Sequence, residues 1–152
     1  MEQTDPQASC SSAHEGESLR YVVKQDGEWI ALLGWSSAAF HLRPRDGWIG
    51  WTDAQRQASR HLLACNSRFV ILQAKGQSPN LASQLLSLNL RHLSEDWQQR
   101  YGHPILLVET YVDPERFEGT CYRAANWTEI GLTQGFGRSR LEFYQLHQKP
   151  KA

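Results

Sequence analysis

A run of four consecutive apolar residues, Ile105-Leu106-Leu107-Val108, most constrains what this chain can fold into. An unbroken apolar run is the pattern of a strand buried on both faces, because a strand with one face in water alternates apolar and polar residues. Such a strand needs neighbouring strands and packed helices to cover it. We therefore expect residues 105–110 to form a central strand of one mixed sheet.

The helix expected before this strand begins at Ser78-Pro79, where Ser78 is an N-cap residue and proline occupies the first helical position. Its leucines form a stripe too wide for a surface helix and typical of a helix packed on a sheet. They are Leu81, Leu85, Leu86, Leu88, Leu90 and Leu93. The helical pattern restarts at Ser94 and is expected to stop at Gly102, just before Pro104.

The rest of the sequence predicts further strands and helices. Two β-rich runs joined through Asp26-Gly27 indicate a hairpin over residues 19–33. Thr52-Asp53-Ala54-Gln55 has the form of a capping box that starts a helix, expected to continue to Cys65. Other strands are expected over residues 36–42, 48–51, 68–74, 129–133 and 141–146, and another helix over residues 120–127. The predicted fold class is α/β (α+β), with a mixed, mainly antiparallel sheet and packed helices.

The length of 152 residues suits one compact domain. Residues 1–17 are polar, acidic and free of aromatic residues, which predicts a disordered acidic tail. Residues 148–152 are expected to form a second disordered tail, which leaves a single α/β domain over residues 18–147. No stretch is apolar enough to span a membrane, and the first residues do not resemble a signal peptide. Three widely separated cysteines argue against a disulfide framework and favour a cytoplasmic location.

The charge is unevenly distributed although the formal net charge is zero. The first 17 residues hold four of the 16 acidic residues and none of the 16 basic ones, so the chain from Ser18 onward carries about +4. Most of the basic residues are arginines, which suit bidentate contacts to phosphate or carboxylate groups. This composition is compatible with a polyanionic partner and equally with ordinary surface ion pairs.

Polar residues are dense just after the expected central strand, where sites gather in open α/β sheets. They are Glu109, Asp113, Thr120, Tyr122, Arg123, Asn126 and Arg138. Glu109 is a candidate general base, because a carboxylate at the end of a buried strand often has a raised pKa. The alternative is that Glu109 is paired with Arg123 or Arg138 and that Asn126 caps a helix.

Two other segments are candidate binding sites. The helix start at Ser78-Pro79-Asn80 has backbone N–H groups that suit a phosphate, although Ser78 alone would also cap the helix. The segment Arg45-Asp46-Gly47-Trp48-Ile49-Gly50-Trp51 suits base stacking or peptide docking, the alternative being a turn with an Arg–Asp pair and two core tryptophans. The six histidines do not pair at ligand spacing, so no metal site is predicted.

Several uncommon strings in this chain resemble the Druantia anti-phage system protein A family over about residues 19–140. They are Trp48-Ile49-Gly50-Trp51, Asn66-Ser67-Arg68-Phe69-Val70-Ile71-Leu72, Asn80-Leu81-Ala82-Ser83, Glu109-Thr110-Tyr111-Val112-Asp113, Gly119-Thr120-Cys121-Tyr122-Arg123-Ala124-Ala125-Asn126-Trp127 and Gly131-Leu132-Thr133-Gln134-Gly135-Phe136-Gly137-Arg138. The resemblance implies a bacterial, cytoplasmic protein of phage defence, of a kind also found fused to transposases. It implies other defence-system proteins as partners.

Two features depart from that family. Relatives usually carry a longer N-terminal portion with a Tyr-His-Tyr-Leu-Gly-Tyr-like segment, in whose place this chain has its acidic tail. The last turn has phenylalanine at Phe136 where relatives tend to have arginine, which removes a positive charge. A remnant whose activity was lost with the N-terminal portion is therefore a third interpretation.

The order of strands and helices also resembles the acetyl-CoA-dependent N-acetyltransferase fold. That resemblance implies Glu109 as a base, Tyr122 as an acid, and Lys75, Ser78, Asn80 and Ser83 around the CoA pyrophosphate. The loop at residues 73–80 lacks the second glycine of that fold, however, and Pro79 has no N–H to donate to a phosphate. We therefore expect no acetyl-CoA binding tighter than about 1 mM.

The leading functional hypothesis is an accessory domain that binds protein or nucleic acid partners and needs no cofactor. The candidate binding residues are Arg45, Asp46, Trp48, Trp51, Arg68, Asp113, Thr120, Arg123, Asn126 and Arg138. The alternative is an acyl-CoA-dependent N-acyltransferase, so the sequence leaves open whether the chain is an enzyme. A body charge of about +4 predicts weak, non-specific nucleic-acid binding that falls steeply with salt.

Overall fold

The computed structural model describes residues 2–4, 16–72, 80–112, 120–135 and 138–146. Its strands are β1 (Glu2–Thr4), β2 (Ser18–Gln25), β3 (Glu28–Ser37), β4 (Leu63–Ile71), β5 (Leu107–Val112), β6 (Thr128–Gly135) and β7 (Arg138–Leu146). Its helices are α1 (Arg43–Ile49), α2 (Asp53–Ser59), a 3₁₀ turn (Arg60–Leu62), α3 (Leu81–Tyr101) and α4 (Thr120–Ala124).

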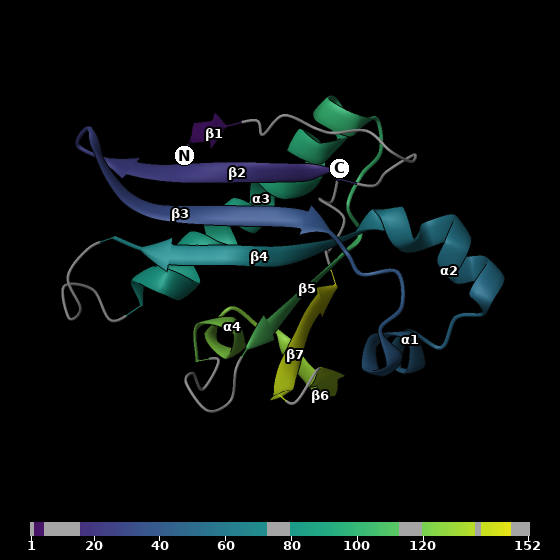
Figure 1. The fold of residues 1–152 in the computed structure, drawn as a ribbon. Coiled ribbons are helices and arrows are strands. Elements are labelled where there is room, and N and C mark those ends of the chain that lie inside the picture. The colour runs from purple at the N-terminus through teal and green to yellow at the C-terminus, as the bar shows by residue number, and fades with distance from the viewer. Residues whose placement is uncertain (1, 5–15, 73–79, 113–119, 136–137, 147–152) are drawn as a thin grey trace.

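The strands form one sheet in the order β1-β2-β3-β4-β5-β7-β6. Strands β4 and β5 run parallel, and the other described neighbours pair antiparallel. Figure 1 shows α3 behind β2, β3 and β4, with α1 and α2 at one end of these strands. The predicted class, a mixed and mainly antiparallel sheet with packed helices, is confirmed.

Strand β5 is buried on both faces, as its apolar run predicts. Val108 belongs to the main core, which α3 covers. Leu107 belongs to a second, smaller cluster with Ala38 and Leu63, against which residues of α1 and its neighbouring loops pack. The strand lies inside the sheet between β4 and β7, so it is the central strand expected from the sequence.

Helix α3 is one continuous helix from Leu81 to Tyr101 and does not restart at Ser94. Its N-cap residue is Asn80, so the start predicted at Ser78-Pro79 is wrong. Its buried residues are Leu85, Leu86, Asn89, Leu90, Leu93 and Trp97. Burying each large apolar side chain contributes roughly 1.5–3 kcal/mol, so this face is a main source of stability. Asn89 provides the acceptor for the indole N–H of a core tryptophan, because its Oδ1 accepts a 2.6 Å hydrogen bond from Trp35 Nε1. Gly102, in the left-handed conformation (φ 82°), ends the helix as predicted.

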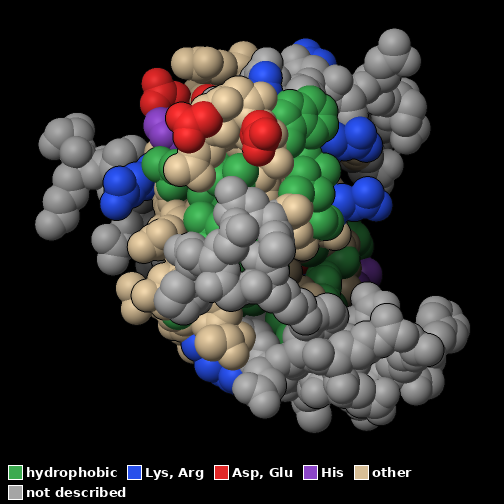
Figure 2. Space-filling model, turned by 90° about the vertical axis from the view of Figure 1, so that its left-hand side faces the viewer, with side chains coloured by type: hydrophobic (Ala, Val, Ile, Leu, Met, Phe, Trp, Pro, Cys, Tyr) green, Lys and Arg blue, Asp and Glu red, His purple; other side chains and the backbone are tan. Residues whose placement is uncertain are grey.

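The hairpin of β2 and β3 turns at Asp26-Gly27, as predicted. Both residues have positive φ, 53° and 82°, which suits a tight two-residue turn between twisted strands. Figure 2 looks onto this end of the molecule, where hydrophobic side chains lie beside Lys and Arg side chains. Strand β3 then runs on to Ser37, so the separate strand expected over residues 36–42 does not form.

Helix α1 occupies the segment in which the sequence predicted a short strand at residues 48–51, so that prediction is wrong. Pro44 lies in the first turn, where its missing N–H costs nothing. The Asp46 carboxylate accepts a 3.0 Å hydrogen bond from the Leu42 N–H just before the helix. Gly50, at φ 75°, ends the helix after Ile49. Contacts at the two ends of α1 thus outweigh the β preference of Trp48 and Trp51.

Helix α2 begins with the predicted capping box. Thr52 Oγ1 accepts from the Gln55 N–H at 3.1 Å, and Gln55 Oε1 accepts from the Thr52 N–H at 2.8 Å. The helix ends at Ser59 and does not reach Cys65, because β4 already starts at Leu63. Cys65 pairs there with Ser36 of β3 and Glu109 of β5, and strand pairing on both sides outweighs the helical pattern.

The N-terminal segment differs from the predicted tail at two places. Residues Glu2–Thr4 form β1, which pairs with β2 at residues Arg20, Tyr21 and Val22. Glu17 is buried, and its carboxylate receives hydrogen bonds from Trp97 Nε1 at 3.0 Å and from His103 Nε2 at 2.7 Å. The ordered domain therefore includes Glu17. The remaining predicted tail residues, 1, 5–15 and 148–152, lie outside the described residues.

Among the described residues, no helix combines the length and the apolar character that crossing a membrane requires.

Candidate functional site

Strands β4 and β5 diverge after a short parallel pairing. They pair from Leu63 and Leu107 as far as Asn66 and Thr110. Beyond that point β4 continues along β3 to Ile71, while β5 continues along β7 to Val112 (Figure 1). We call the place where the two strands part the fork. Where two inner strands stop pairing, their backbone N–H and C=O groups lose their strand partners. These groups can then bind other side chains or a ligand.

A β-bulge in β4 lies at the fork. Gly34 of β3 pairs with Arg68, whereas the next residue, Trp35, pairs with Asn66, so that Ser67 is the extra residue. Asn66 fixes the bulge, because its Nδ2 donates to the Gly34 carbonyl at 3.0 Å and to the Arg68 carbonyl at 3.2 Å. Gly34 is needed here, since a Cβ at this position would lie 3.3 Å from the Cβ of Arg68.

Three side chains join the two strands of the fork to α4. Tyr122 donates its hydroxyl to Asn66 Oδ1 at 2.7 Å. Thr110 donates its hydroxyl to the Asn66 carbonyl at 2.9 Å and lies 3.5 Å from the Tyr122 hydroxyl. The Trp127 ring packs edge-on against Tyr122, with centroids 5.0 Å apart. The fork is therefore bridged by the chain's own polar side chains.

Neither titratable side chain near the fork is activated. Burial raises the pKa of Tyr122 above its ordinary value of 10.0, and the hydrogen bond with Thr110 only partly offsets this. Burial also raises the pKa of the neighbouring Cys121 thiol, so it stays protonated and is a poor nucleophile. Tyr122 is thus a neutral hydrogen-bond donor at physiological pH.

This raised pKa predicts a particular response of stability to alkaline pH. The stabilisation from neutral Tyr122 is complete below pH 10, its unfolded value, and is lost as the pH rises toward the higher folded value. At neutral pH, Tyr122→Phe should cost about 1 kcal/mol through the lost hydrogen bond to Asn66. Above pH 10 the wild type should lose stability faster than the variant, so the difference should shrink. Urea unfolding of both proteins at neutral pH and above pH 10 measures the difference in stability. If this difference is the same at both pH values, Tyr122 does not have the raised pKa of a buried phenol.

Helix α4 ends directly below the fork. The Trp127 N–H donates to the Tyr122 carbonyl at 2.9 Å, and Asn126 has a positive φ of 67°. Asn126 therefore takes the left-handed conformation that follows the end of a helix. This is close to the helix-capping role that the sequence analysis gave as its alternative. Arg123 pairs with Glu129 at 2.7 Å on the surface, and not with Glu109.

Glu109 projects from β5 into a buried ion pair with Arg45 of α1. Arg45 Nη1 lies 3.2 Å and 3.3 Å from the two carboxylate oxygens. The side chain of Arg45 is 0% exposed and that of Glu109 is 1% exposed. Both carboxylate oxygens are thus held by a permanent cation away from solvent, which disfavours Glu109 as a general base.

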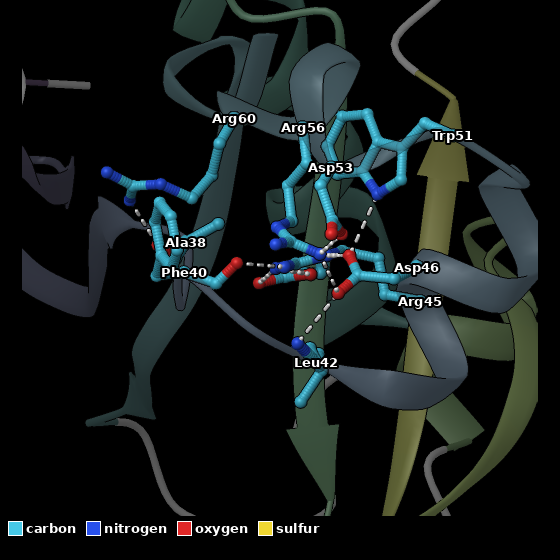
Figure 3. Close-up of polar contacts among 10 residues, drawn as sticks. Ala38, Phe40, Leu42, Arg45, Asp46, Trp51, Asp53, Arg56 and Arg60 are labelled. Carbon is cyan, nitrogen blue, oxygen red and sulfur yellow. Dashed lines mark hydrogen bonds and ion pairs between the residues drawn. The ribbon is translucent and has the colours of Figure 1, made fainter. Parts of the chain in front are cut away.

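A network of charges extends from this pair to α2 (Figure 3). Asp46 accepts from Arg45 Nε and from Trp51 Nε1, both at 3.0 Å, and it lies 3.8 Å from Arg56 Nη1. Burial alone would raise the pKa of Asp46, but these hydrogen bonds, that of Leu42 and the Arg45 charge hold it below its ordinary value. Asp46 is therefore ionised and ties α1 to α2.

Phe40 lies at the outer end of this network and is 43% exposed. The guanidinium carbons of Arg56 and Arg60 lie 5.3 Å and 5.2 Å from the centre of its ring (Figure 3). Arg60 also donates to the Ala38 carbonyl at 2.9 Å, which fixes its position. On α1, Trp48 is 49% exposed, whereas Trp51 is half-buried. We call the exposed side chains of Phe40, His41, Arg43 and Trp48, together with the partly buried Arg60, the α1 surface.

The predicted cofactor residues lie around the start of α3. Lys75 and Ser78 lie outside the described residues. Asn80 occupies the position before the helix without a capping hydrogen bond from its side chain, and Ser83 donates its hydroxyl to the Asn80 carbonyl at 3.1 Å. A shallow groove of about 340 Å³ separates α3 from α4. It is lined by Ser83, Gln84, Ser87, Leu88, Arg91 and Ala124.

The remaining predicted site residues are dispersed. Arg68 is exposed on β4 and Thr120 is exposed at the start of α4. Asp113 and the side chain of Arg138 lie outside the described part of the chain. The site residues that the sequence did not single out are Asn66 and Thr110. Thr110 ends the expected central strand, Asn66 follows the expected helix that reached Cys65, and both stand in strings that resemble the family. Among the described residues, no cluster of three or more His, Cys, Asp or Glu suits a metal ion, and neither Cys65 nor Cys121 is in a disulfide.

Several solved structures share this arrangement of strands and helices. An aminoglycoside acetyltransferase AAC(6')-Ib, in complex with coenzyme A and kanamycin, superposes with a TM-score of 0.61 at 17% identity, covering 86% of this chain and 67% of that one. A spermidine N-acetyltransferase SpeG variant from Vibrio cholerae gives 0.56 at 15% identity, covering 90% and 69%. A GNAT-family acetyltransferase from Bacillus cereus gives 0.54 at 15% identity, covering 88% and 72%. At such identities the likeness concerns the fold alone.

The sequence comparisons place the chain in one family. No curated protein sequence matches it. The model of the family described as Druantia protein DruA matches residues 9–151, which is nearly the whole chain. The chain therefore belongs to the Druantia protein DruA family, and it has the fold of the GNAT N-acetyltransferases.

Proposed function

We propose that the chain serves a Druantia-type anti-phage defence system as a domain that binds nucleic acid, and that acyl transfer is not its activity. Membership of the family supports the defence role. The observation that carries the binding role is the α1 surface, in which an exposed phenyl ring is contacted by two guanidinium groups. Exposed aromatic rings stack on bases, and arginines bind phosphate groups.

The buried network below this surface supports the same role. The α1 surface comes from α1, from Phe40 and His41 before it and from the 3₁₀ turn that follows α2, and helices of only 7 residues could not hold a fixed geometry alone. The Arg45–Glu109 pair and the contacts of Asp46 attach both helices to β5. Preorganised side chains lose less conformational freedom on binding, which favours affinity. The charge density is nevertheless modest, so weak and non-specific binding is expected.

Substitution of the two exposed rings tests this proposal. Trp48→Ala and Phe40→Ala should each weaken the binding of a fluorescein-labelled oligonucleotide by at least about fivefold, since stacking on one ring contributes roughly 1–3 kcal/mol. Fluorescence anisotropy at low salt measures the affinity. Leu88→Ala is the matched control, because Leu88 is an exposed apolar residue (38%) on α3 and should leave binding unchanged. Equal affinities of all four proteins would exclude the α1 surface.

A second candidate, an acyl-CoA-dependent acyltransferase, is favoured by one observation. The Tyr122 hydroxyl lies at the fork, the same helix lines the groove through Ala124, and the fold is that of acetyltransferases. The residues fit such a cofactor poorly, however. Glu109 is held by Arg45, and Tyr122 and Asn66 bridge the fork.

Calorimetry with acetyl-CoA separates the two candidates. We expect no dissociation constant below about 1 mM, which corresponds to roughly −4 kcal/mol. A micromolar constant that weakens in Lys75→Ala would reverse the ranking, because this lysine is the cation nearest in sequence to the helix start. Glu109→Gln and Tyr122→Phe would then be the next variants to assay for acyl transfer.

A further inference from the structure

The face of β2, β3 and β4 turned away from α3 carries side chains that the α1 surface does not include. Alternate residues of these strands point to opposite faces. Tyr21, Leu33 and Phe69 pair across the strands and pack into or against the main core beneath α3. Their neighbours therefore point to the other face, and no helix is drawn in front of these three strands (Figure 1).

The register arranges these outward residues in rows across the strands. One row consists of Arg20, Gly34 and Arg68, and the next of Val22, Leu32 and Val70. Lys24 and Trp29 form a third row on β2 and β3. From these three strands the face receives three basic residues and no acidic one. We call these side chains, together with Leu72 at the end of β4, the sheet face.

Three large apolar side chains of the sheet face are exposed, whereas Val22 is only 4% exposed. Trp29 is 55% exposed, Leu72 48% and Val70 40%, which are three of the six exposed large hydrophobic residues described. Figure 2 shows hydrophobic side chains at this end of the molecule, with Lys and Arg on one side of them and Asp and Glu on the other. An exposed apolar area bordered by polar residues indicates an interaction site.

The two arginines of the sheet face are placed for phosphate groups. Arg20 and Arg68 are both exposed, and neither makes an ion pair with a described residue. They lie two strand spacings apart, about 10 Å, with only Gly34 between them. Gly34 has no side chain, and the position that one would take lies against the Cβ of Arg68 and the hydroxyl of Ser67. No large side chain therefore separates the two guanidinium groups, and both can reach an anionic chain that crosses the sheet.

We propose that the sheet face binds single-stranded nucleic acid. The inference rests on the proposed function, to which it adds the strandedness of the partner and a second contact surface. Trp29 provides a flat ring on which an unstacked base can lie, and Arg20, Lys24 and Arg68 neutralise phosphates beside it. A duplex keeps its bases inside, and a broad sheet cannot enter its grooves as a helix does. The combination of an exposed indole with cations therefore selects single strands.

The test compares variants of the sheet face with a charge-matched control. Trp29→Ala and Arg68→Ala should each weaken the binding of labelled oligothymidylate at least about fivefold, with a smaller effect on a duplex. Arg91→Ala removes the same charge from an exposed position on α3 and should change affinity by less than about twofold. All three positions are solvent-exposed, and unchanged melting curves would confirm that the variants fold.

Each outcome decides between the two proposals. Loss of binding in Trp29→Ala and Arg68→Ala, but not in Arg91→Ala, supports the sheet face. Wild-type affinity in the first two variants, with loss in Trp48→Ala, would overturn the sheet face and leave the proposed function standing. No binding by the wild type at low salt would overturn both. Tighter, Trp29-dependent binding of an acidic peptide than of oligothymidylate would identify a protein partner and also overturn the inference.

Discussion

Replacing Arg45 by methionine should lower the free energy of unfolding by about 3–5 kcal/mol, because it leaves a buried carboxylate without its partner. Glu109 is 1% exposed and has Arg45 on both of its oxygens, so water cannot replace the lost contact. Arg45 also contacts Asp46, whose attachment to α2 would be weakened. Urea unfolding of the wild type and the variant measures the difference.

The double variant Arg45→Met/Glu109→Leu is the control for this prediction. Removing both charges leaves no unpaired ion in the core, so most of the lost stability should return. A single Glu109→Leu substitution should be costly as well, since it leaves the Arg45 cation buried. Should Arg45→Met cost less than about 1 kcal/mol, the ion pair would not hold α1 to β5, and the fixed geometry of the α1 surface would lose its support.

Replacing Glu17 by alanine should lower the free energy of unfolding by about 3 kcal/mol, because two buried donors lose their acceptor. These donors are the Trp97 Nε1 and His103 Nε2 groups, both within 3.0 Å of Glu17 Oε2. Trp97 is 0% exposed and His103 is 7% exposed, so solvent replaces the carboxylate poorly. Thermal unfolding followed by tryptophan fluorescence and circular dichroism measures the loss.

Glu95→Ala is the matched control for Glu17. It removes the same side chain from an exposed position on α3 and should change stability by less than about 0.5 kcal/mol. Equal, small effects of the two substitutions would show that the segment before β2 is not anchored to the end of α3.

Local signals in the sequence predicted several parts of the fold correctly. The positive φ values at Asp26-Gly27 and the capping box of Thr52 and Gln55 depend on neighbouring residues only, so a short string carries the information. The apolar run before Glu109 likewise marks a strand whose environment is buried on both sides. Such features require no knowledge of the rest of the chain.

Features that depend on distant residues were predicted poorly. The sequence offered Arg123 and Arg138 as partners of Glu109 and did not offer Arg45, which lies 64 residues earlier in the chain and contacts both carboxylate oxygens. Arg123 pairs with Glu129, and the side chain of Arg138 lies outside the described part of the chain. Glu17 was assigned to a tail by composition, although His103, 86 residues later, holds it in the core. A single sequence does not encode which charges meet across the sheet until the strand order is known.

Helix α1 shows a different kind of error. The string Trp48-Ile49-Gly50-Trp51, in which the helix ends, has β and turn preferences, which predicted a strand. The helix forms because Pro44, the Asp46 contact with Leu42 and Gly50 act together at its two ends. The same residues place Trp48 on the outside, so the misassigned segment is the one that carries much of the α1 surface.

The salt dependence of oligothymidylate binding by the wild type is the most direct measurement of the central claim, that this domain binds nucleic acid through cations and exposed rings. With the three cations of the sheet face on phosphates, a plot of log affinity against log salt should have a slope of roughly −2, at about −0.7 per phosphate for single strands. In Arg68→Ala the slope should be shallower by about 0.7. Absence of binding at low salt, or binding that does not respond to salt, would contradict the account.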